Sequence, residues 1–293
     1  MRAWISGGSG FVGGHLVEAF DDVLAPSHSE VDVTDADAVR RSIAAHEPDV
    51  IVHAAILNDF SRLEREGWAA YVGATRNVVD AADGALVILV STDWVFSGPA
   101  REDTPPSPVN LYGMLKAASE LVVGERGAVA RISAVQSFRG APRGQDAGFG
   151  YFVASLVRAL RAGERYTVWE GADVNMVATP TLASDAAGLI RRIAERGHRG
   201  IFHCCGGESV DRRTLALRTV DAFGLDGDLL DFGPAPPQPW PVPYDTSLDA
   251  TATAAALGVE LPGVDEQLRR LGQVERPDAD RSDESAGLDA LRR

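Results

Sequence analysis

The chain has 293 residues and a mass of 31.1 kDa, a length that accommodates one large domain or two smaller ones. Hydrophobic residues make up 45% and charged residues 24%, which excludes a wholly disordered chain, and no apolar run approaches the ~20 residues that span a bilayer. With 28 lysines and arginines against 42 acidic residues the net charge is −14, so bulk electrostatics oppose binding to nucleic acid or to an anionic membrane.

The first half of the chain alternates short apolar runs with amphipathic stretches. Buried strands are predicted at Arg2 to Ser6, Asp49 to Ala55, Leu86 to Ser91 and Val129 to Ser133. Helices are predicted between them, from Phe11 to Phe20, Trp68 to Ala82 and Tyr112 to Val123. This alternation indicates βαβ units, and right-handed crossovers then close a doubly wound parallel sheet, the Rossmann type of α/β fold.

The second half is less regular. Residues 139–150 are rich in glycine and form a predicted loop. Further predicted elements are helices from Tyr151 to Ala162 and Leu248 to Leu257, and a strand from Ile201 to Cys205. Six prolines within residues 234–243 exclude a helix or a central strand there.

These patterns predict two units and a tail. We expect residues 1–137, with a return segment at 174–206, to form the Rossmann core. Residues 138–173 and 207–273 then form a smaller mixed α/β domain. Residues 274–293 are polar and charged with little to bury, and are predicted to be a disordered tail.

The only two cysteines, Cys204 and Cys205, are adjacent in the sequence. Adjacent cysteines rarely pair, and two alone make no zinc site, so we expect both to be small buried residues. The N-terminus turns glycine-rich too early for a signal peptide. These features favour a reducing compartment, the cytoplasm, and no spacing of His, Asp and Glu suggests a metal site.

Three glycines, Gly7, Gly10 and Gly13, directly follow the first predicted strand and open the first predicted helix. The first glycine allows a tight turn, the second lets the backbone approach a pyrophosphate, and the third lets helix and strand pack closely. A helix N-terminus also offers free N–H groups to phosphates. Strand, turn and helix occur in the required order, so the sequence predicts a dinucleotide site, with a purely structural turn as the alternative.

The segment that follows the first predicted helix, at the end of the second strand of such a fold, usually selects the cofactor. No carboxylate occurs in Val23 to Ser29, whereas Ser27 and His28 suit a 2′-phosphate. This favours NADP(H) over NAD(H), although both could be ordinary loop residues. Further along, Asp32 and Val33 are candidates to cover the adenine.

Tyr112 and Lys116 are four residues apart on a predicted helix and therefore share one face. A free tyrosine, with a pKa near ~10, is a poor acid or base at neutral pH. A nearby ammonium favours phenolate and is expected to lower that pKa. The pair gains weight from Ser91-Thr92-Asp93 at the end of an apolar strand, because ligands bind at the carboxyl ends of strands in such sheets.

These motifs resemble the extended short-chain dehydrogenase/reductases, and within them the dTDP-4-dehydrorhamnose reductase branch of nucleotide-sugar keto-reductases. The matching segments are the glycine turn, DVTDADAV (32–39), PDVIVHAA (48–55), STDWVFSG (91–98), YGMLK (112–116), ATPTLASDAA (178–187) and GIFHCCGGESV (200–210). The likeness runs from Met1 to about Leu271.

The resemblance implies a carbonyl reductase using NAD(P)H. Thr92 would polarise the ketone, Tyr112 would deliver a proton, and Lys116 would hold the nicotinamide ribose. Further cofactor-binding residues implied by the matching segments are Ser9, Phe11, Val12, His53, Ala54 and Ala55. The implied substrate is a 4-keto-6-deoxyhexose on a nucleoside diphosphate, bound between the core and the smaller domain. Candidate substrate contacts are Asn58, Thr92, Asp93, Gln136, Phe138, Tyr151 and Thr181.

Several positions depart from the family pattern. Tyr71 stands where many relatives have an asparagine, which puts a water relay at that position in doubt. Ala134, Val135 and Gln136 replace an aromatic set that borders the sugar in the reductases, so a different sugar or aglycone fits. Trp94 stands where nucleotide-sugar dehydratases carry glutamate, which disfavours dehydration.

The leading interpretation is therefore an NAD(P)H-dependent reductase of a nucleotide-linked keto-sugar, as a possible homodimer. Three alternatives stay open: a reductase of another carbonyl in specialised metabolism, a nucleotide-sugar epimerase, and a non-catalytic NADP-binding regulatory subunit like the β subunit of methionine adenosyltransferase. The intact Thr92, Tyr112 and Lys116 argue against the last.

Overall fold

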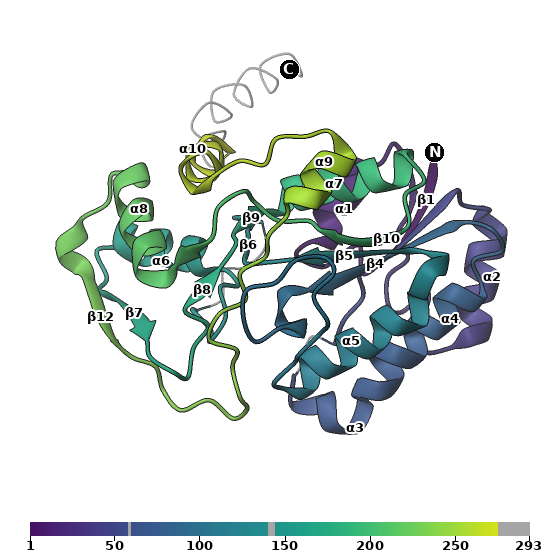
Figure 1. The fold of residues 1–293 in the computed structure, drawn as a ribbon, viewed down its shortest axis with the longest axis horizontal. Coiled ribbons are helices and arrows are strands. Elements are labelled where there is room, and N and C mark those ends of the chain that lie inside the picture. The colour runs from purple at the N-terminus through teal and green to yellow at the C-terminus, as the bar shows by residue number, and fades with distance from the viewer. Residues whose placement is uncertain (58–59, 140–143, 275–293) are drawn as a thin grey trace, which may run out of the picture.

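Six parallel strands form the central sheet of the protein. The computed structural model describes residues 1–57, 60–139 and 144–274 (Figure 1). The strands are β1 (Arg2–Ser6), β2 (Asp22–Leu24), β3 (Val50–His53), β4 (Leu86–Thr92), β5 (Ala128–Ile132) and β10 (Gly200–His203). They lie in the order β10-β5-β4-β3-β1-β2. Every neighbouring pair is parallel, which confirms the predicted doubly wound α/β fold.

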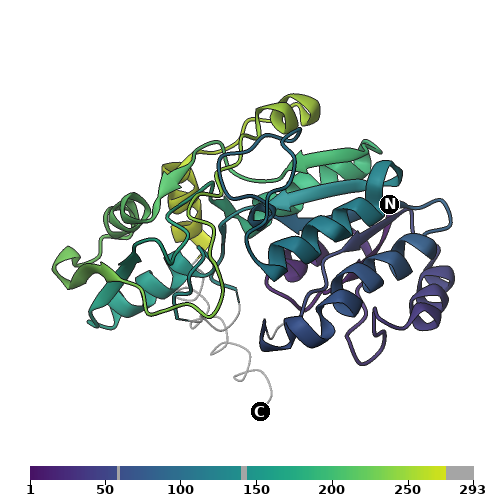
Figure 2. The ribbon, with the colours of Figure 1, turned by 60° about the horizontal axis from the view of Figure 1, so that its bottom comes forward.

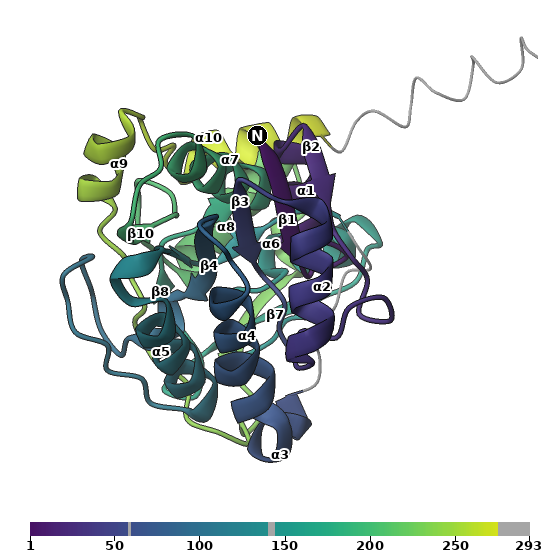
Figure 3. The same ribbon diagram turned by 90° about the vertical axis from the view of Figure 1, so that its right-hand side faces the viewer.

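Helices cover both faces of this sheet, as Figures 1 and 3 show. One face carries α2 (Ala36–His46), α4 (Ala74–Asp80) and α5 (Leu111–Val123), and the other α1 (Gly13–Ala19) and α7 (Ala183–Glu195), with α9 (Thr251–Leu257) beside α7. Side chains alternate along each strand: Ile88 packs with the α1 and α7 side, whereas Val87 and Leu89 pack with the opposite side. Burial on both faces explains why the strands are almost purely apolar.

A second core lies beside the carboxyl ends of the strands (Figure 2). It is built from α6 (Phe152–Arg161), α8 (Arg212–Phe223), α10 (Val264–Val274) and the parallel pair β7 (Tyr166–Glu170) and β12 (Leu230–Pro234). Two short pairs join it to the sheet: β6 (Val135–Gln136) with β9 (Thr181–Leu182), and β8 (Val177–Ala178) with β11 (Val210–Asp211). Ala178 and Leu182 belong to this second core, although they fall in the expected return segment. The division into two units stays a prediction.

Most predicted elements are present with shifted ends. α1 begins at Gly13 rather than Phe11, α9 begins at Thr251 rather than Leu248, and β10 ends at His203. Cys204 and Cys205 follow that strand as buried free thiols.

The helix expected from Trp68 to Ala82 is interrupted. It comprises α3 (Leu63–Gly67), a π-helical turn (Trp68–Gly73) and α4. The π-helical turn exists because the Ala74 N–H bonds the Ala69 carbonyl, five residues back. No sequence pattern had indicated it.

The proline-rich segment forms no helix in residues 235–243, as expected. It crosses between the two cores: Asn110, which caps α5, donates its amide to the Pro241 carbonyl at 3.0 Å, and Asn175 donates to the Pro243 carbonyl at 3.0 Å. Val274, expected in the tail, ends α10, and residues 275–293 lie outside the described part. In the described ranges, no helix has the length and apolarity that crossing a membrane requires.

Candidate active site

The strand order reverses between β1 and β3. The chain runs from β1 outward to β2 and then crosses back to β3 on the other side. In a doubly wound sheet the crevice beyond the carboxyl ends at this point is where ligands bind. The glycine turn after β1, Ala54 and Ala55 after β3, and Thr92 at the end of β4 all lie at this edge.

The glycine turn is tightly folded. Gly7 has a φ of +75°, and the Gly10 N–H bonds the Gly7 carbonyl at 2.9 Å. A Cβ on Gly13 would lie 1.9 Å from the Gly7 carbonyl oxygen, so no side chain fits there. A Cβ on Gly10 would meet only that same oxygen, at 3.1 Å. The turn thus needs its glycines and leaves the side above Gly10 open to a ligand, while Ser9 beside it is exposed.

The loop after β3 is fastened to the glycine turn through Ser6. The Ser6 hydroxyl lies 2.7 Å from His53 Nδ1, and the Ala54 and Ala55 N–H groups donate to its oxygen at 3.2 and 3.3 Å. Burial, together with the nearby Lys116, lowers the pKa of His53 to about 3. His53 is therefore neutral at physiological pH and holds the backbone in place.

Helix α5 carries Tyr112 and Lys116 against the end of β4. Asn110 caps the helix by accepting from the Gly113 N–H at 2.9 Å. Glycine at 113 permits close approach, because a Cβ there would lie 2.2 Å from the Trp94 carbonyl oxygen. Lys116 is buried and donates its ammonium to the Val90 carbonyl at 2.5 Å. The predicted pair thus faces the strand that ends in Thr92.

Thr92 and Asp93 form a buried hydrogen-bond group beside Tyr112. The Thr92 hydroxyl donates to Asp93 at 3.1 Å, and Ser133 and Thr246 each donate to the other Asp93 oxygen at 2.7 Å. Burial raises the pKa of Asp93, while these hydroxyls act in the opposite direction. Asp93 therefore ties β4 to the segments that follow β5 and the proline-rich stretch.

The expected lowering of the Tyr112 pKa is wrong in direction. Burial raises the pKa of Tyr112 to about 12, and the hydrogen bond with Thr92 opposes this only in part. Burial also lowers the pKa of Lys116 to about 8, although the Glu120 carboxylate acts in the opposite direction. Lys116 is the only lysine in the sequence. Arginine supplies the permanent side-chain cations, so Lys116 is the one compact, titratable side-chain ammonium.

Aromatic side chains that the sequence did not single out as site residues enclose Tyr112. Its ring packs edge-on against Tyr71 and Trp94, with centroid distances of 5.9 and 6.2 Å. Gly148 closes over Trp94, because a Cβ there would lie 3.1 Å from that indole. Arg212 fixes this loop by donating to the carbonyls of Asp146 and Gly148. The spacing of these residues in the sequence gives no signal for this enclosure.

The loop after β2 holds a carboxylate that the sequence prediction overlooked. Both the N–H and the hydroxyl of Ser27 donate to Glu30, at 2.8 and 2.7 Å, and these bonds lower the pKa of Glu30. His28 is exposed beside it. Farther on, Asn77 donates to the Val33 carbonyl at 3.0 Å, and Asp32 accepts from Thr34.

One predicted cofactor contact and one predicted substrate contact lie against each other. The Phe11 and Tyr151 rings lie 4.5 Å apart, joining the glycine turn to the start of α6, whereas Val12 is half-buried. Of the other three described candidates, Phe138 packs against the second core, and Gln136 and Thr181 lie in the β6–β9 pair that joins it to the sheet. The Gln136 amide donates to the Ala134 and Phe149 carbonyls at 2.9 Å, Phe138 packs on Phe223, and Thr181 is buried in β9.

Asn58, the remaining candidate, lies outside the described residues. Arg139, which the sequence did not single out, approaches the glycine turn. Its guanidinium lies over Gly14 and pairs with Glu18. It brings a positive charge to the start of α1.

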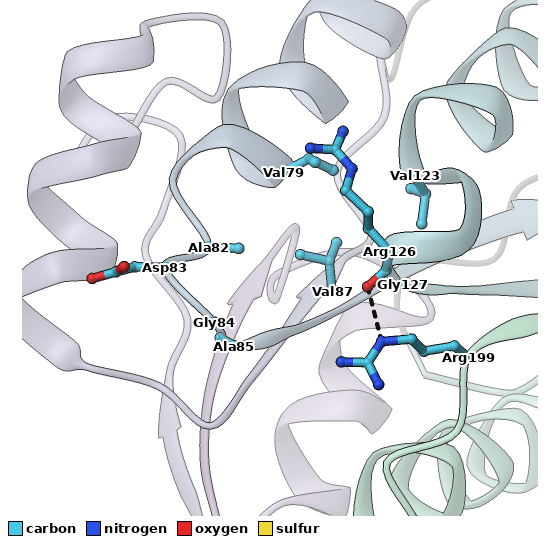
Figure 4. Close-up of a pocket in the computed structure, with 10 residues that line it drawn as sticks. All are labelled: Val79, Ala82, Asp83, Gly84, Ala85, Val87, Val123, Arg126, Gly127 and Arg199. Carbon is cyan, nitrogen blue, oxygen red and sulfur yellow. Dashed lines mark hydrogen bonds between the residues drawn. The ribbon is translucent and has the colours of Figure 1, made fainter.

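A separate cavity of about 190 Å³ opens at the opposite edge of the sheet (Figure 4). Val87 at the start of β4 forms its floor, and Arg126 and Arg199 border it, the Arg199 Nε donating to the Arg126 carbonyl at 3.2 Å. Because Thr92 ends the same strand, this cavity is remote from Tyr112 and Lys116.

Comparison with known proteins identifies one matching family and several relatives. A family model described as RmlD substrate binding domain matches residues 1–275. The dTDP-4-dehydrorhamnose reductase of Mycolicibacterium smegmatis is 32% identical over 279 residues, 87% of this chain and 80% of that protein. The methionine adenosyltransferase 2 subunit beta of Rattus norvegicus is 28% identical over 248 residues, 76% of this chain and 72% of that one.

Solved structures show the same fold. The crystal structure of dTDP-4-dehydrorhamnose reductase from Bacillus anthracis in complex with NADP matches with a TM-score of 0.78 at 22% identity, covering 92% of this chain and 98% of that one. The Rossmann-type fold, the resemblance drawn from the sequence motifs and the assignment to an oxidoreductase type are thereby confirmed. With a matching model that spans nearly the whole described chain, the protein belongs to the RmlD substrate binding domain family.

Proposed function

We propose that this protein is an NAD(P)H-dependent reductase of a keto group on a nucleotide-linked deoxysugar. The observation that carries the proposal is the convergence of Thr92, Tyr112 and Lys116 beside the glycine turn, at the edge of the sheet where ligands bind. The 32% identity to a named dTDP-4-dehydrorhamnose reductase supports the substrate class.

The residues of this chain fit a dinucleotide. Gly7, Gly10 and Gly13 leave a side-chain-free approach for a pyrophosphate, and Arg139 adds a positive charge nearby. We place the adenosine against Ser27, His28, Asp32 and Val33, and the nicotinamide between the loop after β3 and Tyr112. The bound nicotinamide supplies the hydride.

The protein's own residues then manage the proton and the position of the ketone. Tyr112, protonated throughout the neutral range because burial raises its pKa to about 12, acts as the acid that neutralises the developing alkoxide. Thr92 turns its hydroxyl from Asp93 to the ketone oxygen. Lys116 keeps its charge within reach of the ribose, and the aromatic enclosure of Tyr71 and Trp94 excludes water.

The direct test is the oxidation of NADPH, followed by absorbance, with dTDP-4-keto-6-deoxyglucose and with its 3,5-epimerised form. We expect steady consumption with one of the two sugars, and NADH in parallel reports the cofactor preference. Tight NADPH binding without consumption of either sugar contradicts the proposal. That outcome favours another carbonyl substrate or a regulatory role, which the 28% identity to methionine adenosyltransferase 2 subunit beta makes the second candidate.

Cofactor affinity is expected to depend on the charge of Lys116. In the free protein its pKa is about 8, so the ammonium is present below that pH and is lost above it. If the dinucleotide binds the charged form, its Kd is constant below pH 8 and rises above it, while binding raises the pKa of Lys116. Because the chain has one lysine, protein labelled with ¹³C at lysine Cε gives a single NMR signal to titrate. Lys116→Met should flatten the Kd profile; an unchanged profile contradicts this role.

Glu30 is expected to restrain a preference for NADPH. Its carboxylate is held on Ser27, where a 2′-phosphate would lie, and it is ionised at neutral pH because its pKa is lowered. Glu30→Gln removes the negative charge and should improve the Kd for NADPH relative to NADH by about three- to tenfold. Calorimetry with both cofactors measures the ratio. Glu47→Gln, on a distant exposed loop, is the control, and an equal ratio in all three proteins would show that Glu30 lies away from the 2′-position.

A further inference from the structure

The hydroxyl of Tyr71 is buried and has no partner among the residues that the structure describes. The side chain is 2% exposed, and its oxygen has no hydrogen-bond partner within residues 1–57, 60–139 and 144–274. A second buried tyrosine shows the ordinary arrangement: the Tyr166 hydroxyl lies 2.7 Å from the Ser155 hydroxyl. An unsatisfied buried hydroxyl is costly, so a partner that arrives with a ligand accounts for its retention.

Tyr71 sits on the π-helical turn Trp68–Gly73. Turns of this kind occur frequently at functional sites, because the extra residue changes the register of the side chains. Here the turn presses against α5, and Gly67 before it leaves room for Leu115, which a Cβ would meet at 2.5 Å. The backbone therefore departs from a regular helix where it presents Tyr71 to the helix that carries Tyr112.

The surroundings of Tyr71 are those of the nicotinamide position. Its ring lies 5.9 Å from the Tyr112 ring, and the Lys116 ammonium lies 5.8 Å from its centroid. Burial raises the pKa of Tyr71, and the Leu57 backbone acts in the opposite direction without reaching hydrogen-bond geometry. Leu57 follows β3, which lies between β1 with its glycine turn and β4 with Thr92. A dinucleotide that reaches from that turn to Tyr112 passes this position.

We propose that the Tyr71 hydroxyl is a binding residue for the nicotinamide riboside half of the cofactor, donating a hydrogen bond to one of its oxygens. This inference rests on the proposed use of NAD(P)H. The phenol stays neutral at every working pH, so it supplies a donor without adding charge beside Lys116. The bond forms only in the complex, and its energy goes entirely to ligand binding rather than to folding.

The test compares Tyr71→Phe with Tyr166→Phe in urea unfolding of the free protein and in cofactor binding. Tyr71→Phe deletes an unpartnered hydroxyl, so the unfolding midpoint should stay or rise, while the Kd for NADP⁺ should increase about tenfold. Tyr166→Phe deletes a partnered hydroxyl in the second core, so the midpoint should fall with the Kd unchanged. Both substitutions keep the ring and therefore the packing.

Shortened ligands locate the contacted oxygen. Adenosine 2′,5′-bisphosphate lacks the nicotinamide riboside and should bind the wild-type protein and Tyr71→Phe with the same affinity. 2′-Phospho-ADP-ribose retains the second ribose but lacks the nicotinamide base. If it binds Tyr71→Phe more weakly than the wild-type protein, the bond is to the ribose. If it binds both proteins equally, the bond is to the carboxamide.

Three results for Tyr71→Phe would overturn the inference. The first is a Kd for NADP⁺ within twofold of the wild-type value, and the second is an unfolding midpoint that falls as it does in Tyr166→Phe. The third is an equal loss of affinity for NADP⁺ and for both shortened ligands. If the wild-type protein binds no nicotinamide dinucleotide, the proposed function fails together with the inference. Wild-type binding with an unaffected Tyr71→Phe Kd overturns the role of Tyr71 alone.

Discussion

Tyr112→Phe is expected to lower kcat for keto-sugar reduction by about 10²- to 10⁴-fold, the range that general acid catalysis contributes. The substitution removes the hydroxyl that hydrogen-bonds Thr92 and that we propose as the acid, while the ring keeps its contacts with Tyr71 and Trp94. The Kd for NADPH should therefore stay within a few-fold. Stopped-flow absorbance of NADPH oxidation with saturating sugar measures the loss directly.

Tyr244→Phe is the matched control, because Tyr244 is 55% exposed. Its kcat should equal that of the wild-type protein. A Tyr112→Phe variant that retains a tenth or more of the wild-type kcat would assign the acid to another group, with Asp93 the nearest candidate because burial raises its pKa. If the wild-type protein has no activity to lose but binds NADPH, the regulatory reading gains weight.

Features that depend on local sequence could be predicted. The apolar run from Leu86 to Ser91 required a strand covered on both faces, and the structure places it at the third position of the sheet. The glycine turn could be recognised because steric demands at Gly7 and Gly13 leave few alternatives to glycine. The four-residue spacing of Tyr112 and Lys116 similarly fixed a shared helix face.

Features that arise from tertiary packing could not be predicted from the sequence. The rise in the Tyr112 pKa comes mainly from burial, and the two rings packed on Tyr112, those of Tyr71 and Trp94, lie 41 and 18 residues away in the sequence. Glu30 lies just past Val23 to Ser29, the stretch in which a carboxylate selects the cofactor, and only the fold of the loop brings it back onto Ser27. The π-helical turn is set by the backbone bond from the Ala74 N–H to the Ala69 carbonyl, and no periodicity within residues 68–73 marks it.

Arg131→Met is expected to lower the free energy of unfolding by about 3–5 kcal/mol, because it leaves a buried carboxylate without its counter-charge. Arg131 is fully buried and donates to both oxygens of Glu120, at 3.1 and 2.7 Å, while Ser91 donates to Glu120 at 2.5 Å. Urea denaturation monitored by circular dichroism measures the loss. Arg165→Met breaks an exposed pair with Asp231 and should have a much smaller effect.

A double variant shows whether the loss of stability comes from the missing ion pair or from the buried charge that is left unpaired. Glu120→Leu combined with Arg131→Met replaces both charges by apolar groups and should recover at least half of the loss. A loss for Arg131→Met no larger than that for Arg165→Met would contradict the dependence on burial.

The same ion pair reaches the proposed catalytic residues through α5. Tyr112, Lys116 and Glu120 follow one another at four-residue intervals, and the Glu120 carboxylate opposes the effect of burial on the Lys116 pKa. Glu120→Leu should therefore lower the pKa of Lys116 below about 8, which the single lysine signal reports even if activity is lost. The charged form of Lys116 would then disappear at a lower pH, and cofactor affinity would fall at neutral pH. The buried pair between β5 and α5, with Ser91 of β4 donating to it, would thus set the pH at which the site holds its ligand.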